Sequence, residues 1–175
     1  MVDLETYATS ADAVVMTIGA IVFSSNGQEI VSFYRRITED SCISIGLRKD
    51  PETVKFWNGQ PIESRFEIET PIDRVCIIDA IAEFSQFWKD NNCKYFWCLG
   101  ANFDEPIMAL IYQRLNLEKP WLFYNVRCLR TLYSLARVTT KELMKVGDIN
   151  HHALADCKRQ IGGLILSYNR LKSIN

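Results

Sequence analysis

The sequence lacks several features that would place the chain in a class at once. Its six cysteines include no CxxC pair and have no regular spacing, which argues against a zinc ribbon and against a disulfide framework. Cys76 and Cys98 lie inside apolar runs, so we expect reduced thiols and a cytoplasmic location. No apolar run approaches the ~20 residues that span a bilayer, and no basic-then-apolar leader precedes the first strand. Secretion and membrane insertion are therefore not expected.

The chain also lacks the basic excess that is common in nucleic-acid-binding domains, because its formal net charge is −1. The charge is unevenly distributed: residues 1–113 hold 9 Lys and Arg against 17 Asp and Glu, and residues 114–175 hold 11 against 4. This asymmetry indicates either a charged partner or a solvated basic helix face. The composition, with 48% hydrophobic and 23% charged residues, is otherwise average, and the 175 residues are expected to form one domain.

Hydrophobic patterning predicts an α/β layered fold. Three strands near the N-terminus are expected to form an antiparallel meander, at residues 1–5, 13–23 and 29–37. The apolar run 94–99 predicts a strand buried on both faces, and Pro61 and Pro71 bracket a predicted loop. Helix-start signals and apolar residues at three- and four-residue intervals predict helices at 50–57, 77–88, 106–115, 127–137 and 153–171. Strands followed by helices that alternate with a buried strand are typical of α/β layers.

Four acidic residues lie where such a domain presents ligands. Asp3 and Glu5 are two residues apart in the first predicted strand, so their side chains leave the same face. Asp104 follows the buried strand and precedes a helix, where α/β sheets bind ligands, although Asp is also a common helix N-cap. Asp156 lies in the first turn of the last predicted helix, where a carboxylate is favourable in any case.

The only two histidines, His151 and His152, are adjacent and stand just before Asp156. An isolated histidine is more often structural, but one beside an acid-bearing helix start can transfer protons near neutral pH. Four acids converging on one cleft would repel one another unless cations were bound, and oxygen ligands favour Mg²⁺ or Mn²⁺. Two such ions, roughly 3.5–4 Å apart, can stabilise both the attacking water and the leaving oxygen in phosphodiester hydrolysis.

In this order and at these separations, the residues resemble the motifs of the DEDD 3′–5′ exonuclease superfamily. The resemblance is to its histidine-bearing branch, which includes RNase T and the proofreading subunit of bacterial DNA polymerase. Its motifs are Asp3-x-Glu5 in VDLET, Asp104 in GANFDEPIM and His151-x-x-x-x-Asp156 in HHALADCKRQ. Residues 52–60 and 126–132 are similar to the phage-type and mycobacterial exoribonuclease-like subgroup, although Asn125 and Val126 stand where an acid is common. The resemblance implies an RNase H-like exonuclease fold, with a central mixed five-stranded sheet flanked by helices.

The resemblance also implies roles for individual residues. Two divalent metal ions, Mg²⁺ or Mn²⁺, would be held by four acids: Asp3, Glu5, Asp104 and Asp156. The histidine branch places its general base five residues before the last acid, which selects His151, whereas the tyrosine branch uses a spacing of four, which would select His152. Helical geometry favours His152, because residues i and i+4 share a face. In the family, however, the histidine precedes the helix, and we prefer His151.

The implied substrate is the 3′ end of single-stranded DNA or RNA, held by aromatic stacking and backbone contacts. Candidates for these contacts lie near the proposed ligands: Thr6, Tyr7, Trp57 and Phe103. Core packing is the competing explanation for the aromatic residues. Five basic residues are candidates for phosphate contacts, which a second subunit would supply if the protein forms a homodimer. The alternative is that they only solvate helix surfaces. They are Arg127, Arg130, Arg137, Lys141 and Lys145.

The predicted function is a two-metal-ion 3′–5′ exonuclease that releases nucleoside monophosphates, with His151 as the general base. Two alternatives stay open. One is a catalytically weak nucleic-acid-binding or interaction module of the same fold, and the other is a ribonuclease specific for short oligonucleotides. The complete set of four acids and a histidine argues against the module, because a decayed site has no reason to keep carboxylates that repel one another.

Overall fold

The first three strands form the predicted antiparallel meander in the computed structural model, which describes residues 1–144, 146 and 151–173. β1 (Val2–Thr6) pairs with β2 (Val15–Phe23), and β2 pairs with β3 (Glu29–Ile37). The turn between β2 and β3 places Gly27 at a φ of 87°, a left-handed conformation that glycine adopts readily. β1 runs for five residues, a common strand length, although Asp3 is its second residue.

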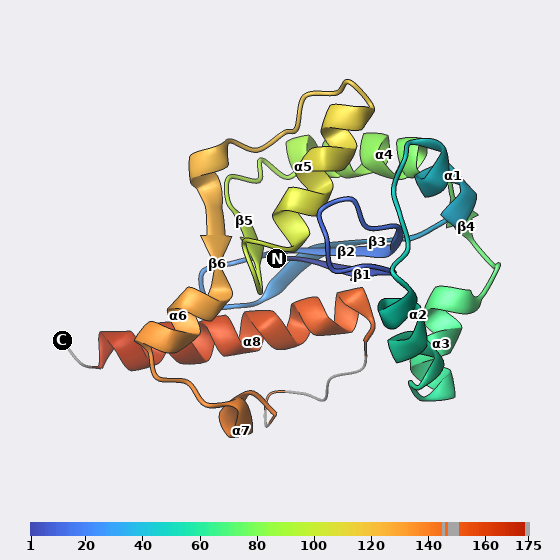
Figure 1. Ribbon diagram of the computed structural model, residues 1–175. Coiled ribbons are helices and arrows are strands. Elements are labelled where there is room, and N and C mark those ends of the chain that lie inside the picture. Colours follow the sequence, from blue (N-terminus) through green and yellow to red (C-terminus); the bar gives the residue numbers. More distant parts are fainter. Residues whose placement is uncertain (145, 147–150, 174–175) are drawn as a thin grey trace.

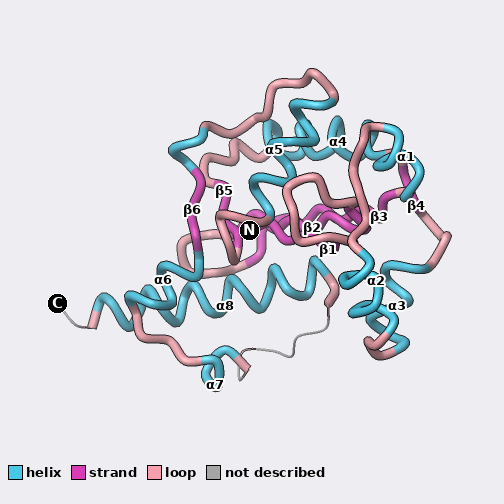
Figure 2. Tube along the Cα trace, in the orientation of Figure 1, coloured by secondary structure: helices cyan, strands magenta, loops and turns pink. Residues whose placement is uncertain are grey.

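The prediction of one five-stranded sheet is wrong for the described residues. β4 (Arg74–Val75) pairs in parallel with β3 and completes a mixed four-stranded sheet in the order β1-β2-β3-β4. β5 (Phe96–Cys98) and β6 (Val126–Cys128) form a separate parallel pair beside β1 (Figure 2). The physical reason is the length of β5: only three of the residues predicted at 94–99 are extended, and their ladder is formed with β6.

Five helices form where the sequence predicts them, with some differences at their starts. They are α2 (Pro51–Asn58), α4 (Ile77–Asp90), α5 (Asp104–Arg114), α6 (Leu129–Leu135) and α8 (Ala153–Lys172). Asp50 caps α2 by accepting a hydrogen bond from the backbone N–H of Glu52 at 3.2 Å. α5 begins two residues before Pro106, because proline is tolerated in the first turn of a helix. The first residues of the helix predicted at 127–137 belong instead to β6.

The predicted loop between Pro61 and Pro71 is instead a helix, α3 (Ile62–Glu69). Its apolar residues Ile62 and Phe66 are exposed, so the segment lacks the buried stripe that identifies a helix in a sequence. Three shorter elements were also absent from the prediction: α1 (Glu39–Ser44), the 3₁₀ helix η1 (Phe123–Asn125) and α7 (Thr140–Leu143).

Helices cover both faces of the four-stranded sheet (Figure 1). α8 packs along one face, and α4 and α5 lie over the other. Gly19 of β2 allows the start of α8 to approach the sheet, because a Cβ atom at this position would lie 2.6 Å from the backbone carbon of Ala153. Since Gly19 is also the partner of Asp3 in the β1–β2 register, this close approach brings the first turns of α8 next to Asp3.

Two further observations concern the cysteines and the helices. The six cysteines, all within the described residues, are free thiols. Among the helices that the structure describes, none combines the length and the apolar character needed to span a bilayer.

Candidate active site

Three of the four acids singled out in the sequence come together at the junction of β1 and α8. Asp3, Glu5 and Asp156 each place a carboxylate oxygen within 4.8 Å of the others. Glu5 and Asp156 are only 7% and 5% exposed, so their charges have little access to water. The alternation of β1 points Asp3 and Glu5 to the same face, and the docking of α8 brings Asp156 to them.

The fourth acid, Asp104, lies beside this cluster and is also buried. It is the first residue of α5, and Phe103 is the N-cap, so Asp104 does not fill the N-cap position that the sequence left open. Its Oδ1 accepts a hydrogen bond from the backbone N–H of Leu4 at 3.2 Å, which ties the start of α5 to β1 between Asp3 and Glu5.

Burial and mutual repulsion favour the protonated forms of these acids. Burial, with repulsion from Asp156 and Asp104, raises the pKa of Glu5 to about 8. Burial also raises the pKa of Asp104 to about 7, although the N–H of Leu4 stabilises its charged form. Loss of hydration and repulsion, above all from Asp104, raise the pKa of Asp3 well above its usual value. Buried oxygen ligands that repel one another fit a hard divalent cation, whose charge would compensate theirs.

Two residues of α8 that the sequence analysis did not select contact these acids. Gln160 donates a hydrogen bond from Nε2 to Oδ1 of Asp3 at 2.5 Å, and its own Oε1 is buried without a hydrogen-bond partner among the described residues. Arg159 donates to Oδ1 of Asp156 at 2.6 Å. Their positions three and four residues after Asp156 put them on the same helix face, which is the sequence signal that could have identified them.

His151 lines a cavity of about 520 Å³ that adjoins the acidic cluster, together with Glu5. Its backbone has a φ of 48°, an uncommon left-handed conformation for a residue other than glycine. Its ring lies edge-on to Phe56 and Trp57 of α2, with ring centroids 5.4 and 5.5 Å away. The histidine that the family spacing selects is therefore in the cavity next to a candidate metal ligand.

His152 is engaged in a different role. It is the N-cap of α8, and its Nδ1 accepts hydrogen bonds from the backbone N–H groups of Leu154 at 3.2 Å and Ala155 at 3.5 Å. Its ring stacks on that of Tyr34, with centroids 4.9 Å apart. A ring nitrogen that accepts hydrogen bonds from a helix end is not free to accept a proton from a water molecule in the cavity.

Three of the four candidate substrate contacts line the same cavity as His151, namely Thr6, Trp57 and Phe103. Trp57 is only 3% exposed and donates a hydrogen bond from Nε1 to the carbonyl of Thr6 at 2.8 Å, so its contact with the core is extensive. Tyr7 lines a separate cavity, where the ammonium of Lys49 lies 4.9 Å from the centroid of its ring.

Phe56, which the sequence analysis did not select, also lines the cavity with His151 and is 47% exposed. Its place before Trp57, in the segment similar to the exoribonuclease-like subgroup, was the available signal. A half-exposed aromatic ring at the mouth of a cavity can stack on a base, whereas the buried Trp57 indole fixes the wall.

The candidate phosphate contacts are spread over several elements. Arg130, the second residue of α6, is exposed and close enough to Asp104 for its charge to favour the ionised form of that acid. Arg127 is held by the carbonyls of Tyr124 and Val126 and lies over the ring of Tyr95. Arg137 follows α6, Lys141 lies on α7, and Lys145 is outside the described residues.

A carboxylate cluster on an α/β fold, with a histidine in the adjoining cavity, fits the class of metal-dependent hydrolases. The chain belongs to the Rv2179c-like 3′–5′ exoribonuclease domain family, whose model matches residues 1–164. It is also similar to the exodeoxyribonuclease of Enterobacteria phage T4, with 28% identity over 96% of this chain and 87% of that protein. These matches confirm the resemblance to phage-type and mycobacterial exonucleases that the motifs indicate, and the family supports 3′–5′ exonuclease activity.

Proposed function

We propose that this chain is a two-metal-ion exonuclease that removes nucleoside monophosphates from the 3′ end of single-stranded nucleic acid. The observation that carries the proposal is the convergence within 4.8 Å of two buried carboxylates, Glu5 and Asp156, and the partly buried Asp3. Arg159 pairs with Asp156, and the charges of Asp3 and Glu5 call for a further cation. The family of the chain and the phage relative support the same reaction.

The metal ligands in this proposal are Asp3, Glu5, Asp104 and Asp156. Their donors are all carboxylate oxygens, which suit Mg²⁺ or Mn²⁺. When bound, two such ions would lower the pKa of a water molecule and stabilise the negative charge on the leaving oxygen. Asp3 would be held among the other three acids, each of which raises its pKa by repulsion, so a bound cation would relieve that repulsion.

The protein side chains position the reacting groups. His151 accepts the proton of the attacking water in the cavity beside Glu5, which makes it the general base. Gln160 holds the carboxylate of Asp3 through its hydrogen bond and limits the rotation of that side chain. His152 is not the base in this mechanism, because its Nδ1 caps α8 and its ring is stacked on Tyr34.

The terminal nucleotide occupies the cavity of about 520 Å³ that Thr6, Phe56, Phe103 and His151 line. Phe56 and Phe103 offer ring faces or edges to a base, a mode of binding that tolerates any sequence. Trp57 contributes indirectly by fixing the wall of the cavity, because its indole N–H donates a hydrogen bond to the carbonyl of Thr6. Tyr7 is not included among the contacts, because it lines a different cavity.

The family description names an exoribonuclease, and the phage relative is an exodeoxyribonuclease, so both RNA and DNA are tested as substrates. The experiment is product analysis on 5′-labelled single strands of graded length, made as DNA and as RNA, with Mg²⁺, with Mn²⁺ and with a chelator. The proposal expects strands that shorten from the 3′ end one nucleotide at a time and only with metal. Cleavage of the shortest strands alone would indicate an oligonucleotide-specific ribonuclease, and binding without cleavage would indicate an inactive module.

We extend the proposal to a single exonuclease domain over residues 1–175 that acts in the cytoplasm. The free thiols of all six cysteines are compatible with that location. A homodimer that supplies basic residues from a second subunit stays a prediction.

A further inference from the structure

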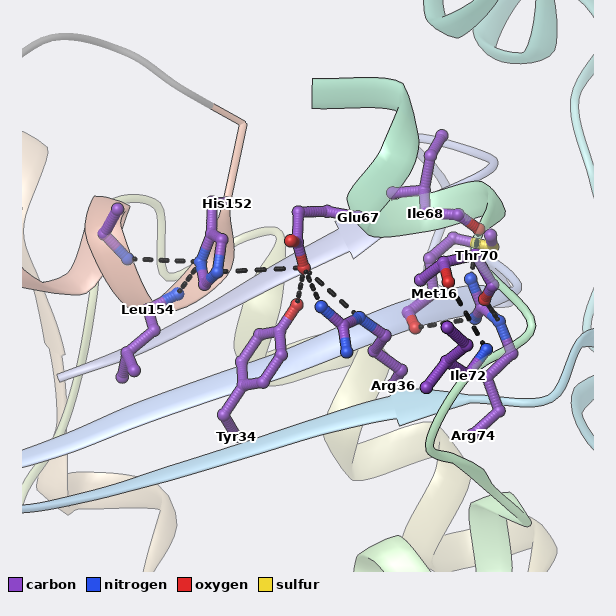
Figure 3. Close-up of polar contacts among 11 residues, drawn as sticks. Met16, Tyr34, Arg36, Glu67, Ile68, Thr70, Ile72, Arg74, His152 and Leu154 are labelled. Carbon is purple, nitrogen blue, oxygen red and sulfur yellow. Dashed lines mark hydrogen bonds and ion pairs between the residues drawn. The ribbon is translucent and has the colours of Figure 1, made fainter. Parts of the chain in front are cut away.

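Outside the acidic cluster, Glu67 of α3 is the centre of a polar network that joins three distant parts of the chain (Figure 3). Its Oε2 accepts a hydrogen bond from the hydroxyl of Tyr34 at 2.8 Å and from Nη2 and Nε of Arg36 at 2.7 and 3.2 Å. Nε2 of His152 lies 3.7 Å from the same oxygen. A single carboxylate oxygen thus faces donors from β3 and from the start of α8.

The orientation of the His152 ring is fixed from both of its nitrogens. Nδ1 accepts backbone N–H groups at the start of α8, so in the neutral ring the proton must reside on Nε2, which faces Glu67. The ring plane is set by Tyr34, on which it stacks with an interplanar angle of 19°. Nδ1 of His152 is occupied by the helix cap, and the negative charge of Glu67 faces the other ring nitrogen, Nε2.

Glu67 is charged in this network. Burial opposes ionisation, but the hydroxyl of Tyr34 and the guanidinium of Arg36 hold the pKa of Glu67 below its usual value. The side chains of Arg36 and Glu67 are only 20% and 17% exposed, so this ion pair is shielded from bulk water. Because Tyr34 and Arg36 belong to β3, the network connects His152 to the central sheet.

The residue next to this network is His151, whose unfavourable φ of 48° must be held by its surroundings. Phe56 and Trp57 of α2 contact its ring from one side. On the other side, the peptide bond to His152 connects it to the ring that Tyr34 and Glu67 hold. We propose that Glu67 is a positioning residue for the reaction: by holding His152 it keeps the imidazole of His151 in the cavity beside Glu5.

This inference rests on the proposed function, in which His151 is the general base. The competing explanation is that Glu67 only attaches α3 to β3. Arg74 allows the positioning role of Glu67 to be separated from this structural role. It donates hydrogen bonds to the carbonyls of Thr70 at 2.6 Å and Ile37 at 2.6 Å, and a further one to the carbonyl of Ile68. The C-terminal end of α3 therefore stays attached to β3 when the side chain of Glu67 is removed.

The test compares Glu67→Ala and Glu67→Gln with a matched control, Glu69→Ala, on the full chain. Glu69 lies on the same helix, is exposed and forms an ion pair with Arg65 at 3.8 Å. We expect Glu67→Ala to lower kcat by about 10- to 100-fold, the range that misplacement of a catalytic group produces. KM and the affinity for Mn²⁺ should stay within about twofold of the wild type. Glu67→Gln, which keeps an acceptor oxygen for Tyr34, should restore part of the loss.

A double-mutant cycle with His151→Ala tests whether Glu67 acts through His151. In the His151→Ala background, Glu67→Ala should lower kcat by no more than about twofold, because the group that it positions is gone. A loss equal to that in the wild-type background, or an unchanged kcat for Glu67→Ala alone, would overturn the proposal.

A second readout is independent of activity. In side-chain NMR spectra, Glu67→Ala should shift or broaden the ring signals of both His151 and His152, whereas Glu69→Ala should not. Signals of His151 that stay unchanged would reject the positioning role even if the protein were not a nuclease. If Glu67→Ala does not fold, the same spectra and the same cycle are recorded with Glu67→Gln. An inactive wild-type protein whose His151 signals respond to Glu67 would instead contradict the proposed function alone.

Discussion

Arg159 donates two hydrogen bonds to Oδ1 of Asp156, from Nη2 at 2.6 Å and from Nε at 3.0 Å. The two side chains are 11% and 7% exposed, so the pair is largely shielded from solvent. One of the proposed metal ligands therefore has a cation of its own, supplied one helical turn further along α8. A guanidinium at this place both neutralises Asp156 and repels an incoming metal ion.

Removing this cation should strengthen metal binding. We expect Arg159→Met, which keeps much of the side-chain volume, to bind Mn²⁺ about tenfold more tightly in calorimetric titration, since a gain of about 1.4 kcal/mol corresponds to that factor. Lys158→Met is the control, because Lys158 lies on the same turn but pairs with Glu29 at 3.3 Å. Unchanged or weaker binding by Arg159→Met would show that Arg159 orients Asp156 for the metal instead of competing with it.

The acidic cluster should make the stability of the metal-free protein depend on pH. The pKa of Glu5 rises from 4.5 to about 8 in the folded protein, and that of Asp104 from 3.8 to about 7. The folded state therefore binds more protons than the unfolded state between these values. The contribution of these two acids to the free energy of unfolding is therefore fully present below their unfolded pKa values and is lost as the pH rises through the folded values of about 7 and about 8.

Urea denaturation in a chelator, at pH values from about 5 to about 8, measures this dependence. We expect the free energy of unfolding of the wild type to decrease over this range relative to that of Glu5→Gln, which lacks one of the buried charges. Excess Mn²⁺ should offset the decrease, because a ligand that binds only the folded state stabilises it. If wild type and Glu5→Gln show the same pH dependence in the chelator, the repulsion assigned to the cluster is wrong.

Two neighbouring aromatic residues of α2 should respond differently to truncation. Phe56→Ala removes a ring that is 47% exposed in the cavity, and we expect KM for single strands to rise by roughly 5- to 160-fold, the equivalent of about 1–3 kcal/mol for one stacked base. Its stability should change little. Trp57→Ala should instead destabilise the fold by about 3–5 kcal/mol, because the indole is buried and holds Thr6.

Steady-state kinetics and thermal denaturation of both variants distinguish these effects. An unchanged KM for Phe56→Ala would remove Phe56 from the substrate contacts. A Trp57→Ala protein of normal stability but raised KM would instead restore Trp57 as a direct stacking partner.

Long periodic segments of the fold were predictable, and short ones were not. β2 and α4 have enough residues for their alternating or helical pattern to be recognised. β4 has two residues and β6 has three, so no period can be read from them. β5 was predicted from the apolar run 94–99, but its three-residue length and its pairing with β6 were not. The helix α3 was missed because it has only three apolar residues, of which Ile62 and Phe66 are exposed and Ile68 alone is buried, so no apolar stripe marks it in the sequence.

The sequence singled out the four acids of the candidate site because each lies near an element end that a motif marks. Their surroundings could not be predicted. The network of Glu67, Tyr34 and His152 joins α3, β3 and the start of α8, and no local spacing connects these segments. Likewise, only the structure distinguishes the two adjacent histidines: His152 caps α8, whereas His151 lines the cavity.

The central claim is that the four acids, namely Asp3, Glu5, Asp104 and Asp156, bind the metal ions required for hydrolysis. The variant Asp104→Asn tests this claim most directly. The asparagine keeps an oxygen that can accept the N–H of Leu4, so the fold should be preserved while one ligand charge is lost. Release of nucleoside monophosphates from labelled single strands, measured with Mg²⁺ and with Mn²⁺, should fall by about 1,000-fold or more, corresponding to several kcal/mol of transition-state stabilisation. Full activity of a folded Asp104→Asn protein would contradict the account.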